Sequence, residues 1–275
     1  MGTNREVLKN AKRIVVKVGT SIITYDTGKV NFSRIDRLAR VLSDVMNQGR
    51  EVVLVTSGAI GVGVGRLKLR EKPRTVREKQ AVAAVGQCEL MHIYSKFFSE
   101  YGHIVGQILL TRDVVDDGHR RQNVINTFET LLEKGIIPIV NENDSVAIDE
   151  IEYGENRVFG DNDTLSAIVS ELICADLLII LSDIDGFYDG DPKKNSCSRL
   201  IPVIEEITPE IEKFAGGAGT KRGTGGMVTK LAAAKIAAAS GTNMVLSNGS
   251  NPSIIMNILN GEEIGTLFCA HKKHR

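Results

Sequence analysis

The chain alternates short, continuously apolar runs with longer stretches in which apolar residues recur every three or four positions. The short runs are rich in β-branched residues, which is typical of strands buried on both faces of a parallel sheet. The predicted strands are residues 13–18, 51–56, 104–110, 136–140, 177–181 and 243–247. The helical pattern predicts helices at residues 33–48, 76–100, 121–134, 163–175, 227–240 and 252–260. This alternation of strands and helices predicts an α/β layered sandwich.

The helix predicted at residues 33–48 has signals at both ends. Ser33 is the predicted N-cap, and Gly49 is the predicted stop. The chain has no long Pro/Ser-rich linker and no internal repeat. We therefore expect a single domain, with two halves that meet near residue 176.

The amino-acid composition limits the kinds of partner that this protein is expected to bind. The 275 residues include 34 Lys plus Arg and 34 Asp plus Glu, so the net charge is zero. We therefore expect no nucleic-acid and no membrane partner. The longest apolar runs, such as LLIIL at 177–181, are far too short to cross a bilayer. The four cysteines are far apart and show no C-x-x-C spacing, which predicts reduced thiols in a cytoplasmic protein and no cysteine-bound metal.

Residues 66–79 form the strongest charge run, with seven basic and two acidic residues. Such a run could bind an anionic partner. More often it is a solvated loop that leads into a helix, and we favour that interpretation.

Four glycine-containing turns follow predicted strands, at the edge where α/β sheets bind ligands. The first is VVKVGTS at 15–21. Lys17 stands near the end of a buried strand, where an ammonium group needs an anionic partner. Backbone N–H groups of Gly19, Thr20 and Ser21, together with Lys17, would suit phosphate. The alternative is a lysine that extends its charge from the strand end into solvent.

The second turn is VTSGAIGVGVG at 55–65. It does not fit the dinucleotide fingerprint, because Arg66 stands where the third glycine is required. What remains is a strand ending in Thr56-Ser57-Gly58 and a turn lined with N–H donors, which could hold a small carboxylate or phosphate. The alternative is a tight strand-to-helix turn.

The third feature is a pair of polar clusters, each beside an apolar run. Their members are Asn141, Glu142, Asn143, Asp144, Ser145, Asp161, Asn162 and Asp163. These side chains could bind an ammonium group or hold lysines in place. Asp163 could also cap the helix that starts near it. Neither this stretch nor residues 183–191 fits a calcium loop.

The fourth feature combines LLIILSDIDGFYDGDP at 177–192 with GTGGMVTK at 223–230. Ser182 and Asp183 close a predicted strand. The glycines of the second stretch let a backbone approach phosphate, and the helix after it points its N-terminus at the same place. This is not a Walker A loop, because Lys230 follows Thr229 and not glycine. A flexible loop before an alanine-rich helix is an equally good interpretation of this stretch alone.

Taken together, the turns place Lys17 and Lys230 on separate glycine-rich segments. Phosphoryl transfer needs positioning and charge neutralisation, which two lysines, N–H groups and Mg²⁺ would supply. No histidine falls in any of the four features. A carboxylate acceptor needs no base, because a pKa of about 4.3 leaves it ionised at neutral pH. The residues therefore favour a kinase that makes an acyl phosphate.

These motifs in this order resemble the amino-acid kinase family, and among its members those that phosphorylate the side-chain carboxylate of L-glutamate. The motifs are VVKVGTS, VTSGAI, AAVGQ (83–87), LLTRDV (109–114), NENDSV (141–146), GDNDTLSA (160–167), SDIDGFYDGDP (182–192) and GTGGMVTK. The resemblance runs from about residue 13 to 268. It implies a three-layer αβα sandwich on a mainly parallel sheet, as a single domain over residues 1–275. The substrate-binding half would be about 1–175 and the nucleotide-binding half about 176–275.

The activity that the resemblance implies is ATP-dependent phosphorylation of the γ-carboxylate of L-glutamate, the first step of proline biosynthesis. Lys17 and Lys230 would stabilise the phosphoryl group, and Asp163 would hold both lysines. Glutamate would be bound by Ser57, Asp144 and Asn162. The residues expected at ATP are Lys17, Ser182, Asp183, Thr224, Gly225, Gly226, Met227, Val228, Thr229 and Lys230. Mg²⁺ would be bound mainly through nucleotide phosphates, so no protein metal ligand is expected.

The resemblance also implies a homo-oligomer (dimer or tetramer), feedback inhibition by proline and a cytoplasmic location. Many family members carry a C-terminal PUA domain; we expect this protein to lack one and to be active without it. The insert-like segment 148–159 is expected to reshape the glutamate site. Three alternatives stay open: a kinase of acetylglutamate, aspartate, carbamate or uridylate; a nicotinamide-dependent oxidoreductase; and a non-catalytic amino-acid sensor.

Overall fold

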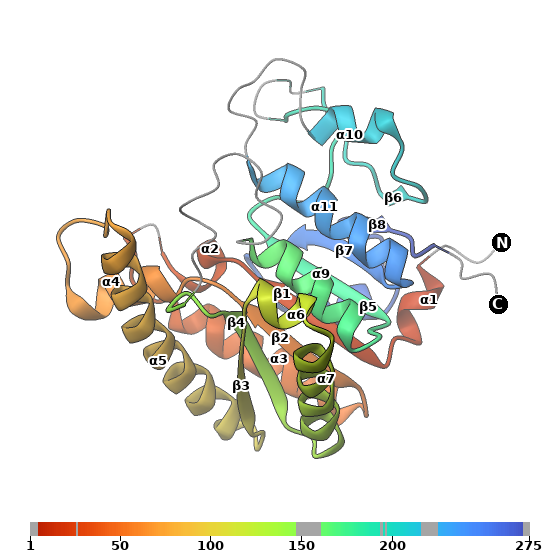
Figure 1. The fold of residues 1–275 in the computed structure, drawn as a ribbon. Coiled ribbons are helices and arrows are strands. Elements are labelled where there is room, and N and C mark those ends of the chain that lie inside the picture. The colour runs from red at the N-terminus through yellow and green to blue at the C-terminus, as the bar shows by residue number, and fades with distance from the viewer. Residues whose placement is uncertain are drawn as a thin grey trace.

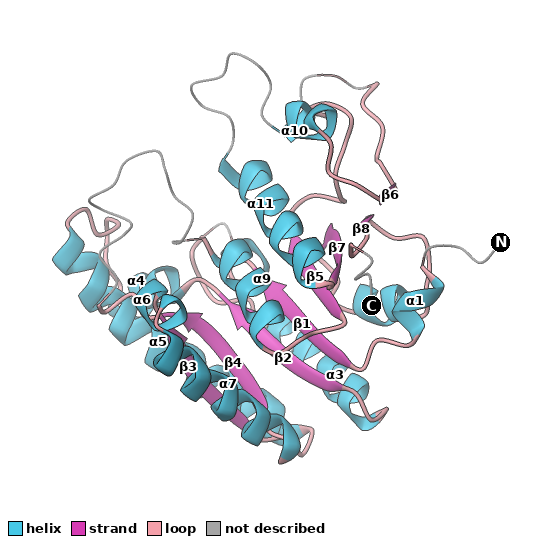
Figure 2. Cartoon of the chain, turned by 45° about the vertical axis from the view of Figure 1, so that its right-hand side comes forward, coloured by secondary structure: helices cyan, strands magenta, loops and turns pink. Residues whose placement is uncertain are grey.

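The computed structural model describes residues 5–25, 27–146, 161–192, 195, 197–215 and 225–271. These residues form a central sheet with helices on both faces (Figures 1 and 2). The expected three-layer αβα sandwich is therefore confirmed. The predicted insert at 148–159 and Thr224 lie outside the described residues.

The sheet has eight described strands in the order β3-β4-β2-β1-β5-β7-β8-β6. All described neighbours pair in parallel except β7 and β8. The strands are β1 (Arg13–Val18), β2 (Glu51–Thr56), β3 (Val105–Leu110), β4 (Ile137–Glu142), β5 (Leu177–Ser182), β6 (Val203–Ile204), β7 (Asn243–Asn248) and β8 (Thr266–Phe268). All six predicted strands are present. The periodicity missed β6 and β8, because strands of two or three residues leave too short a pattern.

The described helices include all six that the periodicity predicts. They are α1 (Glu6–Lys9), α2 (Thr20–Ile23), α3 (Phe32–Asn47), α4 (Ala59–Leu67), α5 (Val76–Glu100), α6 (Arg112–Asp116), α7 (Gly118–Glu133), α9 (Asn162–Leu172), α10 (Pro209–Ala215), α11 (Gly225–Ser240) and α12 (Ile254–Leu259). The prediction of Ser33 as the N-cap of α3 is wrong. Asn31 caps this helix, and its side chain accepts a hydrogen bond from the Arg34 N–H. Gly49, with φ of 81°, follows the helix as predicted.

Alternate residues of each central strand enter two different cores. Val16 and Val18 pack with α3, α5 and α12 on one face, whereas Val15 packs with α7, α9 and α11 on the other. This two-sided burial explains why the strands are continuously apolar. Figure 2 shows α9 and α11 lying side by side over the second face. Side chains along a strand alternate between its two faces, and Lys17 stands two residues after Val15. The Lys17 side chain therefore points to the same face as Val15, which α9 and α11 cover.

The glycine-rich stretch after β2 is a tight turn at Gly58 followed by a helix, which agrees with the alternative of a strand-to-helix turn. Gly58 turns the chain from β2 into α4 with φ of 91°. The turn requires glycine for this backbone conformation, whereas a Cβ there would meet only side-chain atoms, the nearest being Ile23 Cδ1 at 2.9 Å. The glycines inside α4 instead allow α5 to pack closely. A Cβ on Gly63 would lie 2.1 Å from the Val82 carbonyl oxygen.

Gly86→Ala is expected to lower the free energy of unfolding by about 1–3 kcal/mol, because overpacking forces backbone to shift. The added Cβ would lie 1.7 Å from the carbonyl oxygen of Ala59. Gly118→Ala in α7 is the matched control, since nothing lies within 4 Å of its Cβ position. Urea unfolding of both variants measures the difference. Equal stability of the two variants would contradict the close approach of α4 and α5.

The order of strands also fixes where a ligand can bind. From β1 the chain continues to β2 on one side, and it later returns to β5 on the other side of β1. Where the connections from neighbouring parallel strands run to opposite sides, a crevice forms at the carboxyl ends of those strands. The segments that follow β1, β2, β4, β5 and β7 therefore meet at one edge of the sheet.

Candidate active site

The centre of the site is Asp163, in the first turn of α9. Its Oδ1 lies 2.5 Å from Lys17 Nζ, and its Oδ2 lies 2.9 Å from Lys230 Nζ. The side chain of Asp163 is 2% exposed, that of Lys17 is 9% exposed and that of Lys230 is 11% exposed. The structure thus brings together the three residues that the sequence expected to act together, from β1, α9 and α11. One carboxylate holds two buried ammonium groups side by side.

The expectation that Asp163 caps α9 is wrong. Asp161 is the N-cap, and its side chain accepts a hydrogen bond of 3.3 Å from the Asp163 N–H. The cap therefore lies two residues earlier, and the Asp163 carboxylate is left for the lysines. Thr229 Oγ1 also donates to Asp163 Oδ2, at 3.4 Å.

The electrostatics of the cluster favour the ionised carboxylate. Burial raises the pKa of Asp163, but the charges and hydrogen bonds of Lys17 and Lys230 outweigh burial and hold the pKa below its ordinary value. The cluster keeps two positive charges against one negative charge. It therefore retains a net positive charge in a low-dielectric setting, where an anionic phosphoryl group would be strongly stabilised.

Each lysine of the cluster lies beside a glycine. A Cβ on Gly19 would lie 3.7 Å from Lys17 Nζ, and one on Gly226 would lie 3.8 Å from Lys230 Nζ. Lys230 Nζ also donates to the Gly226 carbonyl oxygen at 3.1 Å. Two glycine turns from opposite halves of the chain thus flank the ammonium pair, and neither has a side chain to block a ligand. Figure 1 shows that β1 and α11 come from the two ends of the chain.

Ser57 lies at the other side of β1, directly after β2. Its Oγ donates to the Val18 carbonyl oxygen at 3.1 Å, and Thr20 Oγ1 donates to it at 3.5 Å. The hydroxyl proton of Ser57 is therefore already donated to Val18, so toward a ligand Ser57 Oγ can act only as a hydrogen-bond acceptor. Next to it, the first intrahelical bond of α4 runs from the Val62 N–H to the Gly58 carbonyl. The earlier N–H groups of this helix point out of the helix end, where an anion binds well.

The remaining expected substrate residues lie at the same sheet edge. Asp144 follows β4 and is half-buried, and Asn162 is the first residue of α9. Asn162 Oδ1 is buried and has no hydrogen-bond partner among the described residues. Ser57, Asp144 and Asn162 come from three elements whose ends the parallel sheet brings to one side.

The expected nucleotide residues fall on the β5 side of the edge. Ser182 Oγ donates to Asp183 Oδ1 at 3.0 Å at the end of β5. Residues 225–230 form the first turns of α11, with Gly226, Thr229 and Lys230 turned toward Asp163. A polar pair that was not predicted from the sequence also lies here: Asn248 Nδ2, at the end of β7, donates to Asp185 Oδ1 at 2.8 Å. Its position after a predicted strand was the only signal that could have found it.

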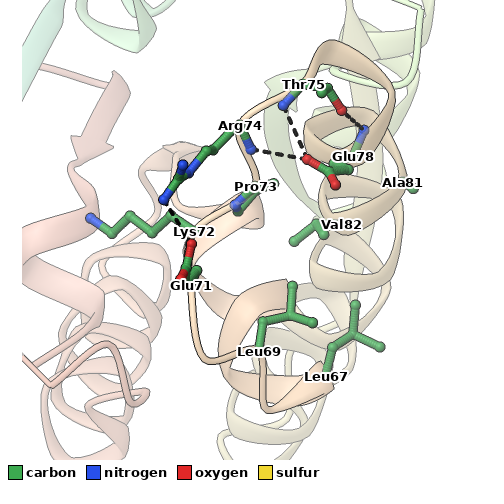
Figure 3. A pocket seen from close by; sticks show the side chains of 10 residues that line it. All are labelled: Leu67, Leu69, Glu71, Lys72, Pro73, Arg74, Thr75, Glu78, Ala81 and Val82. Atoms are coloured by element: carbon green, nitrogen blue, oxygen red, sulfur yellow. Dashed lines mark hydrogen bonds and ion pairs between the residues drawn. The ribbon is translucent and has the colours of Figure 1, made fainter.

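The basic run at 66–79 lies away from this cluster. It ends α4, forms a loop and leads into α5, where Thr75 and Glu78 form a capping box. Most of its residues are exposed, and Arg74 pairs with Glu71 at 2.8 Å. A hollow of about 590 Å³ lies beside this loop. Residues of α4, the loop and α5 line it (Figure 3). The favoured interpretation, a solvated loop leading into a helix, agrees with this structure.

The model of the family described as "Amino acid kinase family" matches residues 12–248 of the chain. The chain belongs to this family. It is 66% identical to a glutamate 5-kinase of Clostridium perfringens, over 98% of this chain and 99% of the relative. It is also 58% identical to a glutamate 5-kinase of Listeria monocytogenes, over 98% of this chain and 97% of the relative.

Solved structures of kinases share the fold. A carbamate kinase from Giardia lamblia bound to AMP-PNP aligns with a TM-score of 0.66 at 17% identity, over 95% of this chain and 99% of its own. A UMP kinase from Bacillus anthracis aligns with a TM-score of 0.62 at 16% identity, over 94% of this chain and 96% of its own. At such identities the likeness establishes the fold alone, and it agrees with the sandwich described above.

None of the described helices combines the length and apolar character that a membrane span requires. Within the described ranges, no three His, Cys, Asp or Glu side chains gather closely enough to hold a metal ion. The described cysteines are all free thiols.

Proposed function

We propose that this enzyme transfers the γ-phosphoryl group of ATP to the γ-carboxylate of L-glutamate, giving L-glutamyl 5-phosphate and ADP, the first step of proline biosynthesis. The observation that carries the proposal is the Asp163 carboxylate, which holds Lys17 and Lys230 side by side at the carboxyl edge of the sheet. The glutamate 5-kinases that share 66% and 58% of its residues support the choice of acceptor.

The cluster suits phosphoryl transfer because it supplies charge without a base. A carboxylate oxygen of glutamate forms a bond to the γ-phosphorus while the bond from that phosphorus to the β,γ-bridging oxygen breaks. The electron pair leaves with ADP, and no proton moves because the acceptor is already ionised. The ammonium groups of Lys17 and Lys230 stabilise the charge that spreads over the phosphoryl oxygens. Asp163 holds both cations, one on each of its carboxylate oxygens.

The substrate half suits an amino acid that carries a positive α-ammonium group and negative carboxylates. Ser57 can only accept a hydrogen bond, which matches the α-ammonium group. The free N–H groups at the start of α4 match a carboxylate. Asp144 and the unpaired Asn162 Oδ1 add acceptors for the same ammonium group. These contacts support glutamate binding by Ser57, Asp144 and Asn162.

Mg²⁺ belongs to the proposal as a partner of ATP. The ion is proposed to be bound mainly through phosphate oxygens, because Mg²⁺ keeps much of its coordination for water and substrate phosphates. When bound, the ion neutralises phosphate charge. Ser182, Asp183, Thr224 and residues 225–230 are proposed to surround the nucleotide.

We also propose how the enzyme is inhibited, how it assembles and where in the cell it is located. Proline is proposed to inhibit by feedback, the enzyme to form a homo-oligomer, and the location to be cytoplasmic. Free cysteine thiols support a reducing compartment. Size-exclusion chromatography with light scattering tests the oligomer, and the activity assay with added proline tests the inhibition.

The direct test is ADP release by the purified enzyme with Mg-ATP, in the presence of hydroxylamine to trap an acyl phosphate. L-glutamate is compared with N-acetylglutamate, aspartate, carbamate and UMP. Glutamate-dependent ADP release with a trapped hydroxamate is expected. Activity on another acceptor alone would overturn the choice of substrate but keep the phosphoryl site. No activity on any acceptor would favour a non-catalytic sensor.

Asp144→Ala is expected to raise the KM for glutamate by about tenfold or more, because a charged hydrogen bond to the ammonium group is lost. The KM for ATP should stay near its wild-type value. Ser145→Ala, at the next and exposed position, is the matched control. Initial rates over both substrate concentrations separate the two constants. A rise in the KM for ATP instead would show that the division into substrate and nucleotide halves is wrong.

A further inference from the structure

Helix α5 makes two polar contacts with the strand ends beneath the substrate half. Tyr94 OH and Thr56 Oγ1, at the end of β2, are 2.8 Å apart. Two turns earlier, Gln87 Oε1 accepts a hydrogen bond of 2.9 Å from Asn141 Nδ2, near the end of β4. The inward residues of α5 around them are mostly apolar.

The Gln87–Asn141 pair is poorly explained by stability alone. Gln87 and Asn141 are 8% and 2% exposed, and Gln87 Nε2 is buried without a partner among the described residues. A buried donor without a partner costs free energy. Two apolar side chains of similar shape would fill the same space without that cost. The pair therefore serves a purpose other than holding α5 on the sheet.

The pair joins the two walls of the proposed glutamate site. Gly86, the neighbour of Gln87, meets the Ala59 carbonyl of α4 so closely that no Cβ fits between them. Ala59 follows the Ser57-Gly58 turn directly. Asn141 lies three residues before Asp144. Gln87 therefore adds a side-chain link between the backbone of α4 and the end of β4, beyond the last pair of the β2–β4 ladder at Val55 and Val140.

We propose that Gln87 is a positioning residue for the amino-acid acceptor. By orienting Asn141 it sets the separation between the Ser57-Gly58 turn and Asp144, and through that separation the KM for glutamate. The inference rests on the proposed function, in which those two segments bind glutamate. It does not require Gln87 to touch the substrate. The nucleotide half lies across β1 and should be unaffected.

The test uses Gln87→Met, Asn141→Leu and the double variant. Gln87→Met is expected to raise the KM for glutamate about tenfold, with the KM for ATP within about twofold of wild type. The double variant leaves neither amide unpaired, so its Tm should recover toward wild type. Its KM for glutamate should nevertheless stay raised. A purely structural role would restore the KM together with the Tm.

Thr242→Val is the matched control. Thr242 Oγ1 is buried and donates to the Ala175 carbonyl at 2.8 Å, at the opposite edge of the sheet. This variant should lower the Tm without changing either KM. Wild-type KM for glutamate in Gln87→Met, or a KM that returns to wild type in the double variant, would overturn the inference. Wild-type enzyme that lacks glutamate-dependent ADP release would instead refute the proposed function.

Discussion

Lys230→Ala is expected to lower kcat by about a hundredfold to a thousandfold while the fold persists, because one preorganised charge on the transferring phosphoryl group is lost. Lys230 is 2.9 Å from Asp163 and 11% exposed in its side chain, so water replaces its charge poorly. The KM for glutamate should change much less than kcat, since the interaction is strongest in the transition state. Steady-state kinetics with saturating Mg-ATP measure the effect.

Lys235→Ala is the matched control for this prediction. Lys235 lies on the same helix, pairs with Glu212 on α10 and is 49% exposed in its side chain. Its loss should leave kcat near the wild-type value, because exposed pairs contribute little. Circular dichroism confirms that both variants are folded. Near-normal turnover of Lys230→Ala would rule out the proposed role of this lysine.

Asp163→Asn is expected to lower kcat by about a thousandfold and the free energy of unfolding by about 3 kcal/mol. The amide keeps the shape of the side chain but leaves Lys17 and Lys230 buried without their counter-charge. The two ammonium groups then repel each other and lose their alignment. Urea unfolding and single-turnover kinetics measure the two effects. Asp176→Asn, whose side chain accepts from the Lys12 and Arg13 N–H groups at the other sheet edge, controls for the substitution.

The contribution of Asp163 to stability should also depend on pH. Because its pKa in the folded protein is lowered, the contribution is fully present above the unfolded pKa of 3.8 and is lost as pH falls through the lower folded pKa. The difference in free energy of unfolding between wild type and Asp163→Asn should therefore be constant near neutral pH. It should shrink as pH falls below 3.8. A difference that does not depend on pH would show that Asp163 is not ionised beside the lysines.

Local patterns determined much of this structure. Continuous apolar runs specified the strands, because a parallel strand covered on both faces has no polar side to show. Apolar recurrence specified helices such as α3 and α5, with an error of one residue at each end of α3 and none for α5. The residues that cap the helices were harder to predict. Asn31 supplies the capping oxygen of α3 in place of Ser33, and Asp161 supplies that of α9 in place of Asp163. Several polar residues in a row can each cap, and only the backbone path selects one.

The helix that follows the Gly58 turn after β2 was not predicted from the sequence, for a physical reason. Gly61, Gly63 and Gly65 lower helix propensity, so the pattern predicted no helix at residues 59–67. The structure makes them helical because Gly63 and Gly86 allow α4 and α5 to touch backbone to backbone. This gain depends on a partner helix about twenty residues away, which no local pattern reports.

By itself the sequence determined which chemical groups are present: two lysines on glycine-rich turns, clustered acids and amides, and no histidine among them. The tertiary structure alone decided how they combine. Lys17, Asp163 and Lys230 are far apart in sequence, and they meet because parallel strands bring the segments after β1 and β4 and the start of α11 to one edge. Likewise the Gln87–Asn141 contact exists only because α5 crosses the end of β4. Distances between buried charges are set by packing, and packing is a property of the whole fold.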